Sequence, residues 1–188
     1  ELDELLAVCL NWNITLVEDA AESLGSFYKG RHTGTVGDSG AISFNGNKII
    51  TTGGGGMVLC KTQELGERTK HVTTTAKVPH PYEFFHDEPG FNYRMPNLNA
   101  ALGCAQIESI AQYLKQKKMI AQRYEEFFKG TDIKFVTEPE YAQSNYWLNA
   151  IICPDKESRE EILNYTNSVG VMVRPIWKLM HRLPMFEG

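Results

Sequence analysis

The stretch Thr15-Leu-Val-Glu-Asp-Ala-Ala-Glu-Ser23 decides the fold, because a short apolar run leads directly into two acids and a turn of small residues. Residues 3–12, just before it, carry apolar side chains at helical spacing. Residues 15–17 then predict a short buried strand that ends in Glu18 and Asp19. A helix followed by such a strand is typical of an α/β sheet covered on both faces.

Further elements of the same sheet are predicted downstream. Residues 28–37 are rich in glycine and threonine and predict an exposed hairpin or loop. Strands are expected at 41–44 and 57–60, and residues 62–73 favour a helix. The prolines, aromatics and glycine of residues 78–95 indicate a long ordered loop without regular structure.

A long helix is predicted next, with Asn97 as its cap and an end near Phe128. Apolar residues recur at steps of four and three, and the first turns are apolar almost all round, which predicts burial on several sides. Beyond Gly130 the pattern changes to strands at 133–136, 146–153 and 171–174, with a helix at 156–168. We therefore expect a partial large domain at 1–130 and a small, truncated α+β domain at 131–188.

The composition excludes several classes of protein. A net charge of -4 without any basic run speaks against a nucleic-acid partner. No apolar stretch approaches the roughly 20 residues that cross a bilayer. The four cysteines have no zinc-site spacing, so buried reduced thiols in a cytoplasmic protein are expected, and no metal site is predicted.

Three residues carry candidate chemistry. Asp19 follows a buried strand, where α/β sheets bind ligands, and its carboxylate could hold a cationic ring nitrogen; a structural cap is the alternative. Lys48 follows the strand at 41–44 and precedes a glycine run, so it could be a reactive amine, or a solvated loop lysine. Ser43 has a hydroxyl that could bind phosphate, or it is an ordinary strand serine.

Seven motifs occur together in a fixed order. They are Val17-Glu-Asp-Ala-Ala-Glu-Ser-Leu-Gly25, Tyr28-Lys-Gly30, Gly37-Asp38, Ser43-Phe44, Lys48, Thr51-Thr-Gly-Gly-Gly-Gly-Met57 and Gly90-Phe-Asn-Tyr-Arg-Met95. This set closely resembles the DegT/DnrJ/StrS family of sugar aminotransferases. The resemblance covers almost the whole chain and implies the fold-type-I, aspartate aminotransferase-like fold, with pyridoxal 5'-phosphate (PLP) as cofactor.

The resemblance also implies a role for each matching residue. Asp19 would pair with the pyridine nitrogen of PLP, Ser43 would bind its phosphate and Lys48 its aldehyde. Glu22 stands where much of the family has glutamine, near the ring oxygen. Asn92 would reach the phosphate of the neighbouring subunit's cofactor, because the family forms homodimers with shared active sites. Arg94 could contact the substrate or hold its loop through an ion pair.

The reaction implied by the family moves an amino group from glutamate to a nucleotide-linked 4-keto-6-deoxy sugar. Residues 73–81 and 174–181 resemble the branch that acts on UDP-linked N-acetylhexosamines, with GDP-perosamine synthases as near neighbours. His181 is a further candidate for substrate contact, as are His86 and Trp177, although packed or solvated roles fit each of them too. The run Gly53–Gly56 lacks the ending of a P-loop and predicts close backbone packing beside the cofactor.

Two other functions remain open at this stage. A sugar 3-dehydratase of the same fold carries histidine in place of the lysine, so Lys48 speaks against it. A non-catalytic regulatory or binding protein could keep the fold. The first residue falls inside a predicted helix, so we expect a fragment without the N-terminal part, and this fragment alone should be inactive.

Overall fold

The computed structural model describes residues 1–186, which form two compact units. The first unit contains residues 1–124 and 137–149, and the second contains residues 125–136 and those from 150 onward. The division into domains at residue 130 concerns the whole protein and stays a prediction.

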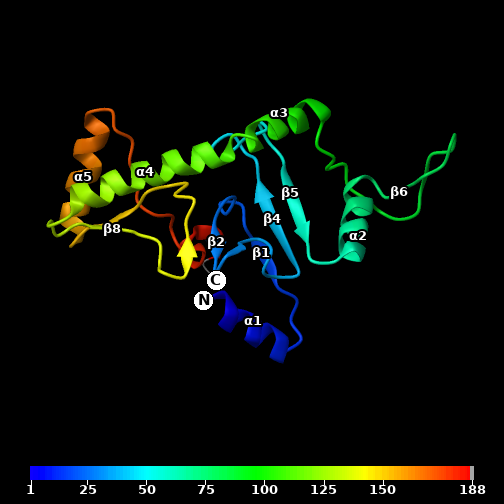
Figure 1. Ribbon diagram of the computed structural model, residues 1–188, viewed down its shortest axis with the longest axis horizontal. Helices are drawn as coiled ribbons and strands as arrows, with labels where there is room; N and C mark the ends of the chain where they lie inside the picture. The colour runs from blue at the N-terminus through cyan, green and yellow to red at the C-terminus, as the bar shows by residue number, and fades with distance from the viewer. Residues whose placement is uncertain (187–188) are drawn as a thin grey trace. The chain divides into compact units, whose positions relative to one another are not determined.

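The central sheet of the first unit has the strand order β1-β4-β5 (Figure 1). Strand β1 (Val17–Asp19) is parallel to β4 (Ser39–Ser43), and β5 (Gly56–Cys60) is antiparallel to β4. In this register Val17 lies opposite Ser39, and Asp19 lies opposite Ala41. Helix α1 (Leu2–Asn11) precedes the sheet, as its periodicity predicts. A mixed α/β class is thereby confirmed.

Strand β1 begins two residues later than the sequence predicts. Leu16 precedes the ladder because Asp38 binds both of its backbone groups: Leu16 N–H donates to Asp38 Oδ2 at 3.0 Å, and Asp38 N–H donates to Leu16 O at 2.8 Å. The hydrogen bond from Leu16 N–H holds the pKa of Asp38 below its ordinary value. The predicted burial is also wrong, since Val17 is 64% exposed on an edge strand of the described sheet.

The carboxylate of Glu18 anchors the turn that leads into β4. It accepts backbone N–H hydrogen bonds from Gly34 at 2.7 Å, Val36 at 2.6 Å and Gly37 at 2.7 Å. Gly34 has a φ of 94°, and a Cβ there would lie 2.9 Å from the Cβ of Ala20. The turn is therefore held by charge-assisted hydrogen bonds in a conformation that favours glycine.

A small apolar core supports the end of the sheet near Lys48. Its buried members are Ala20, Ile42, Phe44 and Ile50. Leu59, Met95 and Tyr113 are among the partly buried side chains that pack against them. The core therefore joins the sheet to the loop after β4 and to the helical region that follows residue 95.

The predicted hairpin is present, with β2 (Phe27–Tyr28) antiparallel to β3 (Arg31–His32). Its two-residue turn, Lys29-Gly30, has positive φ at both positions, 47° and 78°, which suits a tight hairpin. Strand β9 (Ala142–Gln143) pairs with β2 on its other side. The hairpin is less exposed than expected, because Tyr28 and Val36 are both buried.

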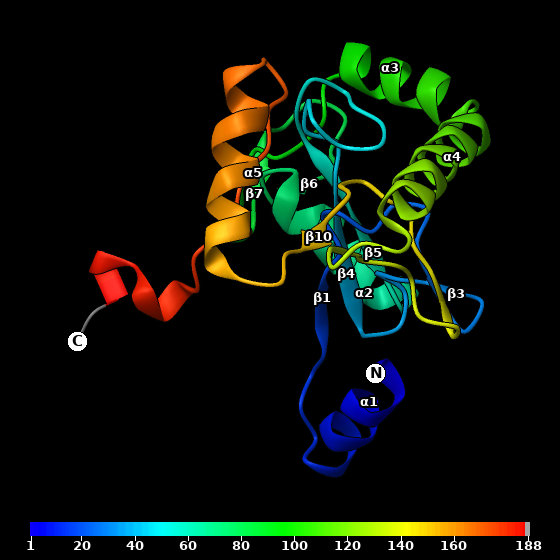
Figure 2. The same ribbon diagram turned by 90° about the vertical axis from the view of Figure 1, so that its left-hand side faces the viewer.

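Helix α2 (Gln63–Thr73) lies beside β5 (Figure 1, Figure 2). It begins as predicted, because the side chain of Thr62 accepts a hydrogen bond from Leu65 N–H at 3.2 Å. The prediction that residues 78–95 form a loop without regular structure is wrong in part. Two short strands, β6 (Lys77–Val78) and β7 (Phe85–His86), form an antiparallel hairpin within it.

Two consecutive helices occupy the region predicted as one, namely α3 (Asn97–Ile107) and α4 (Ile110–Phe128). The predicted cap is wrong: Pro96 takes the cap position without a side-chain hydrogen bond, and Asn97 is the first helical residue. Burial on several sides is also wrong for the described chain, since Leu98 is 87% exposed. Helix α3 therefore carries more apolar side chains than the described chain buries.

The second unit pairs β8 (Lys134–Phe135) with β10 (Ile151–Ile152) and contains α5 (Lys156–Ser168). The strand predicted at 171–174 is absent. Gly170, with a φ of 82°, ends the helix, and Val171 N–H then returns to Thr166 O at 2.8 Å. The backbone after α5 therefore closes the helix end instead of joining a sheet. Two short 3-10 helices follow, Met180–Arg182 and Pro184–Phe186.

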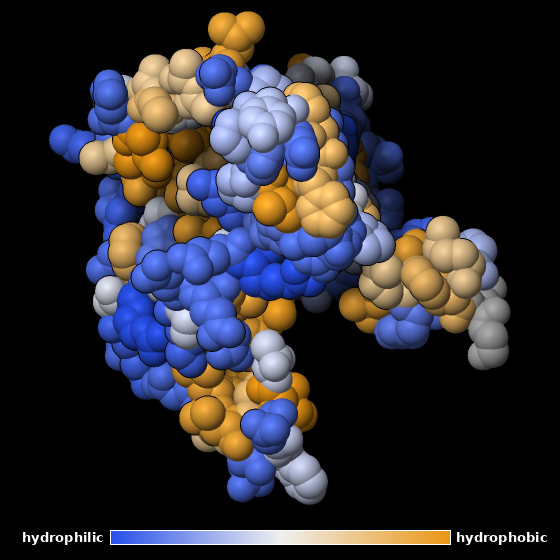
Figure 3. Space-filling view, turned by 90° about the vertical axis from the view of Figure 1, so that its right-hand side faces the viewer, coloured by the Kyte–Doolittle hydropathy of each residue, from blue (hydrophilic) through white to orange (hydrophobic). Residues whose placement is uncertain are grey.

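The described residues include no helix with the length and apolar character needed to span a membrane. All four cysteines are free, but only Cys9 is buried and Cys104 is exposed, so their predicted burial is wrong for three of the four. Apolar side chains gather over α1 at the bottom of Figure 3, where Leu5, Val8 and Leu10 are exposed. A cytoplasmic location stays a prediction.

We expect Glu18→Ala to lower the free energy of unfolding by at least about 3 kcal/mol. A hydrogen bond to a charged group contributes roughly 1.5–3 kcal/mol, and three bonds to one carboxylate are not additive. Chemical denaturation of the protein measures the change. Glu18→Gln keeps one acceptor oxygen and should lose less, and Glu4→Ala on the exposed surface of α1 is the control. A loss for Glu18→Ala no larger than for the control would contradict the anchoring role.

Candidate functional site

Asp19 and Ser43 lie at the carboxyl ends of neighbouring parallel strands. Asp19 ends β1 and pairs with Ala41, and Ser43 ends β4 two residues further along. The Asp19 carboxylate accepts a hydrogen bond from Ala21 N–H at 3.2 Å. Ser43 Oγ accepts one from Asn45 N–H at 3.2 Å, which leaves its hydroxyl proton available. The structure thus places an anion and a hydroxyl donor at one edge of the sheet.

Lys48 is largely shielded from solvent. Its side chain is only 12% exposed, and its Nζ forms an ion pair with the carboxylate of Glu22. The same Nζ stands 4.3 Å from the ring centroid of Trp147, within the range of a cation–π contact. The alternative prediction, a solvated loop lysine, is therefore wrong for Lys48. The structure brings Lys48 and Glu22 together.

Trp147 and Asn145 are site neighbours that the sequence analysis missed. The indole N–H of Trp147 donates to Asn47 O at 2.6 Å, and its backbone N–H donates to Asn145 Oδ1 at 2.8 Å. Buried Asn145 donates through Nδ2 to Glu22 O at 2.6 Å and to Leu24 O at 3.0 Å. The contacts with Asn47, Leu24 and Glu22 span 100, 121 and 123 residues of chain. The local sequence signal is limited to the run Asn145-Tyr-Trp147.

The segment that carries Trp147 is fixed to α4. Lys117 Nζ donates to Trp147 O at 3.1 Å, and Lys118 pairs with Glu138 at 2.8 Å. Glu138 also accepts from Ser144 N–H at 2.6 Å. Burial alone would raise the pKa of Glu138, but these hydrogen bonds outweigh it and hold the pKa below its ordinary value. The indole is thereby held in place over Lys48.

The glycine run after Lys48 allows close backbone packing. Gly53 and Gly55 have φ values of 81° and 88°, and a Cβ on Gly56 would lie 2.3 Å from Ile42 O. Asn99 on α3 donates to Thr52 O, and Gln106 Oε1 accepts from the N–H of the preceding threonine at 2.9 Å. Helix α3 therefore holds the loop that contains Lys48.

The remaining predicted residues lie elsewhere. Asn92 forms a β-bridge with Thr74 just after α2. Arg94 lines an open hollow of about 500 Å³ together with Thr74, Lys77, Pro79, His80 and Pro81. His181 lies in the 3-10 helix Met180–Arg182 of the second unit, and Trp177 of the same unit is 72% exposed.

Two other histidines have structural partners. His80 Nδ1 accepts from Glu83 N–H at 2.9 Å, and His86 Nδ1 lies 2.7 Å from Thr75 O. Both therefore support the hairpin of β6 and β7. One group of three side chains in the described chain could hold a metal ion, His71, Asp87 and Glu88, whose ligand atoms lie within 4.8 Å of one another.

The described chain thus combines a carboxylate and a hydroxyl at the carboxyl ends of two parallel strands with a shielded amine in the loop that follows, within an α/β fold. The chain belongs to the DegT/DnrJ/EryC1/StrS aminotransferase family, which it matches over residues 1–188. The family expected from the sequence motifs is confirmed.

Individual relatives agree with this assignment. The chain is 34% identical to GDP-perosamine synthase of Escherichia coli O157:H7 over 187 residues, covering 100% of this chain and 51% of that protein. It is 30% identical over 186 residues to the UDP-4-amino-4,6-dideoxy-N-acetyl-beta-L-altrosamine transaminase of Campylobacter jejuni (strain 81-176), covering 95% of this chain and 50% of the relative. The chain thus spans about half the length of these relatives.

A solved structure shows the same fold. Helicobacter pylori PseC, an aminotransferase involved in the biosynthesis of pseudoaminic acid, superposes with a TM-score of 0.93 at 21% identity, covering 100% of this chain and 52% of PseC. The fold-type expectation for a partial chain is therefore confirmed.

We expect Trp147→Ala to increase the acylation of Lys48 in the cofactor-free protein, because the indole covers its Nζ. Limited treatment with an amine-acylating reagent, followed by peptide mass mapping, measures the rate. Lys61, 57% exposed, is the internal reference, and Trp147→Phe should cause a smaller increase because a ring remains. Equal acylation of Lys48 in wild type and Trp147→Ala would show that the indole does not shield it.

Proposed function

We propose that the whole protein is a PLP-dependent aminotransferase that moves an amino group from glutamate to a nucleotide-linked 4-keto-6-deoxy sugar. The observation that supports this most directly is Lys48, a shielded amine held beside Glu22 at the sheet edge that carries Asp19 and Ser43. When bound, PLP supplies an electron sink for the carbon from which a proton is removed. The donor set fits this group, because it offers an anion, a hydroxyl and an amine.

Each side chain has a definite task in this proposal. Asp19 holds a proton on the ring nitrogen through its negative charge. Ser43 donates its hydroxyl proton to the phosphate. Lys48 would hold the aldehyde end of PLP, for which its amine must be uncharged, and its Nζ would take up the proton from the substrate carbon that bears nitrogen.

Glu22 and Trp147 orient and shield the lysine. The Glu22 carboxylate forms an ion pair with Lys48 Nζ, and the indole keeps water away from the amine. A carboxylate at this position gives Lys48 a charge-assisted contact, where the glutamine expected from much of the family would give a neutral hydrogen bond.

The substrate half of the proposal depends on charge. Arg94, Lys77 and His80 line a hollow whose size suits a nucleotide, and the two permanent cations would bind its diphosphate. We also propose that Asn92 reaches the partner's cofactor in a homodimer, and that His181 contacts the sugar. GDP- and UDP-sugar enzymes are both among the relatives, so the base of the nucleotide is left open.

Borohydride reduction of the full-length protein with PLP should attach the pyridoxyl group to Lys48, because its amine is the one held at the sheet edge. Peptide mass mapping identifies the labelled residue. Lys48→Ala should abolish both the label and turnover while the fold is retained. A pyridoxyl group on Lys29 or Lys61 would refute the assignment.

Asp19→Asn should slow transamination by about ten- to a hundredfold, since a neutral amide gives up a charge-assisted hydrogen bond of roughly 1.5–3 kcal/mol. Steady-state rates at saturating PLP measure the loss, and thermal unfolding checks that the protein still folds. Glu4→Gln, a surface carboxylate on α1, serves as control. Wild-type rates for Asp19→Asn would refute the proposed role of this carboxylate.

A further inference from the structure

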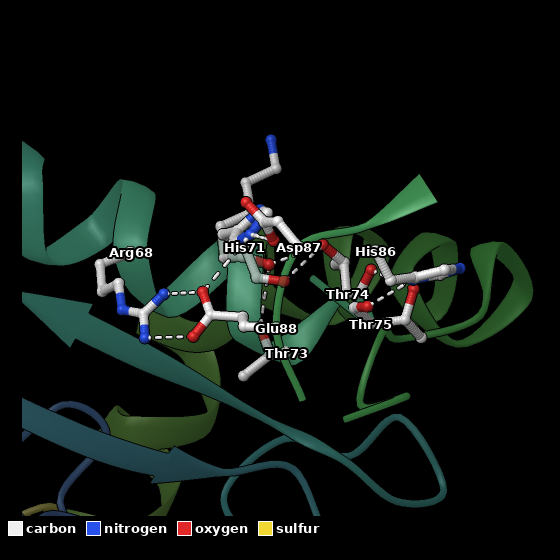
Figure 4. A network of polar contacts seen from close by, with 9 residues as sticks. Arg68, His71, Thr73, Thr74, Thr75, His86, Asp87 and Glu88 are labelled. Atoms are coloured by element: carbon white, nitrogen blue, oxygen red, sulfur yellow. Dashed lines mark hydrogen bonds and ion pairs between the residues drawn. The ribbon is translucent and has the colours of Figure 1, made fainter. Parts of the chain in front are cut away.

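Residues 74–95, which we call the fold-back, leave α2, form the β6–β7 hairpin and return over the last turn of the helix (Figure 4). Three backbone hydrogen bonds fix the return: Phe91 N–H donates to Val72 O at 2.7 Å, Tyr93 N–H to Thr73 O at 2.9 Å, and Thr75 N–H to Phe91 O at 2.9 Å. Asn92 lies between the first two of these bonds. Its position therefore depends on how the fold-back sits on α2.

The backbone of the fold-back is crowded where Gly90 packs against Thr75 and Ala76. Thr75 and Ala76 have positive φ values of 68° and 50°, a conformation that side chains with a Cβ rarely adopt. Ala76 is completely buried, and a Cβ on Gly90 would lie 2.5 Å from Ala76 N. Such a conformation persists only when surrounding contacts hold it in place.

Four charged or titratable side chains provide such contacts; we call them the clamp, and they are Arg68, His71, Asp87 and Glu88. The guanidinium of Arg68 bonds both carboxylate oxygens of Glu88, with Nη2 2.6 Å from Oε2. His71 Nε2 lies 2.7 Å from Asp87 Oδ1. Figure 4 shows both pairs joining α2 to the segment that follows β7.

The geometry of the clamp follows from the sequence. Arg68 and His71 are three residues apart on α2, so they share one face of the helix. Asp87 and Glu88 are consecutive and follow β7 directly. The hydrogen bond from Arg68 holds the pKa of Glu88 below its ordinary value, and the contact with His71 does the same for Asp87.

A metal ion is a poorer explanation of this cluster. Both oxygens of Glu88 already bond a guanidinium that carries a permanent positive charge. A divalent cation would have to displace Arg68 or lie beside it. The cluster is therefore better described as an ion-pair network than as a ligand set.

We propose that the clamp positions the ligand-binding end of the fold-back. It ties the segment after β7 to α2. The clamp thereby sets where Asn92 meets the cofactor phosphate and where Arg94 meets the substrate. The clamp residues touch neither ligand and act through the backbone. This inference rests on the proposed function for the roles of Asn92 and Arg94.

Glu88→Gln in the full-length protein tests the mechanical part, because it removes the charge and retains the shape. We expect amide hydrogen exchange across residues 74–95 to become about three- to fivefold faster, with β4 and β5 unchanged. The double variant Arg68→Glu/Glu88→Arg restores the pair with reversed charges and should exchange more slowly than either single reversal. Glu64→Gln, at the other end of α2, is the matched control. Unchanged exchange in Glu88→Gln would overturn the proposal.

PLP affinity tests the functional part. Glu88→Gln should weaken PLP binding by a similar factor and raise the KM for the sugar nucleotide, with kcat nearly unchanged at saturation. Asn92→Ala separates the two hypotheses. If Asn92→Ala weakens PLP binding and Glu88→Gln does not, the clamp is merely structural and the inference is wrong. If Asn92→Ala itself leaves PLP affinity unchanged, the proposed role of Asn92 fails instead.

Discussion

The parallel pairing of β1 with β4 is the constraint on which the candidate site depends. It places Asp19 opposite Ala41 and hence next to the strand that ends in Ser43. Glu18 supports this pairing, because its carboxylate holds the intervening turn through three backbone N–H groups. Gly40 is part of the same constraint, since a Cβ there would lie 2.2 Å from Gly34 O. Any larger residue would push the turn off β4 and move the acid away from the lysine loop.

A second set of contacts encloses the lysine at this sheet edge. Residues 145–147 approach from far along the chain and bind the backbone carbonyls of Glu22, Leu24 and Asn47, through Asn145 and the indole of Trp147. Because the bonds go to backbone groups, they fix the loops independently of which side chain is present at position 22. Lys48 is therefore shielded by a segment that lies about a hundred residues away in the sequence and is itself fixed by backbone hydrogen bonds.

The sequence predicts elements whose signals are local. Helix α2 and strands β4 and β5 lie within two residues of the expected ranges 62–73, 41–44 and 57–60. Predictions that rest on only a few residues are less reliable. Asn97 was expected as the helix cap, but Pro96 holds that position. Residues 171–174 were expected as a strand, but Val171 closes the end of α5 instead. The candidate residues Asp19, Ser43 and Lys48 could be identified from the order of the family motifs. The contacts of Trp147 could not be predicted, because they join segments a hundred residues apart. The roles of the site residues stay predictions.

The central claim is that the edge shared by β1 and β4 binds PLP through Lys48. A crystal structure of the full-length protein grown with PLP tests it most directly. The account predicts continuous electron density from Lys48 Nζ to the cofactor, with the Asp19 carboxylate at the ring nitrogen and the Ser43 hydroxyl at the phosphate. Cofactor density that lies away from this edge, or that is unconnected to Lys48 while Asp19 faces solvent, would contradict it.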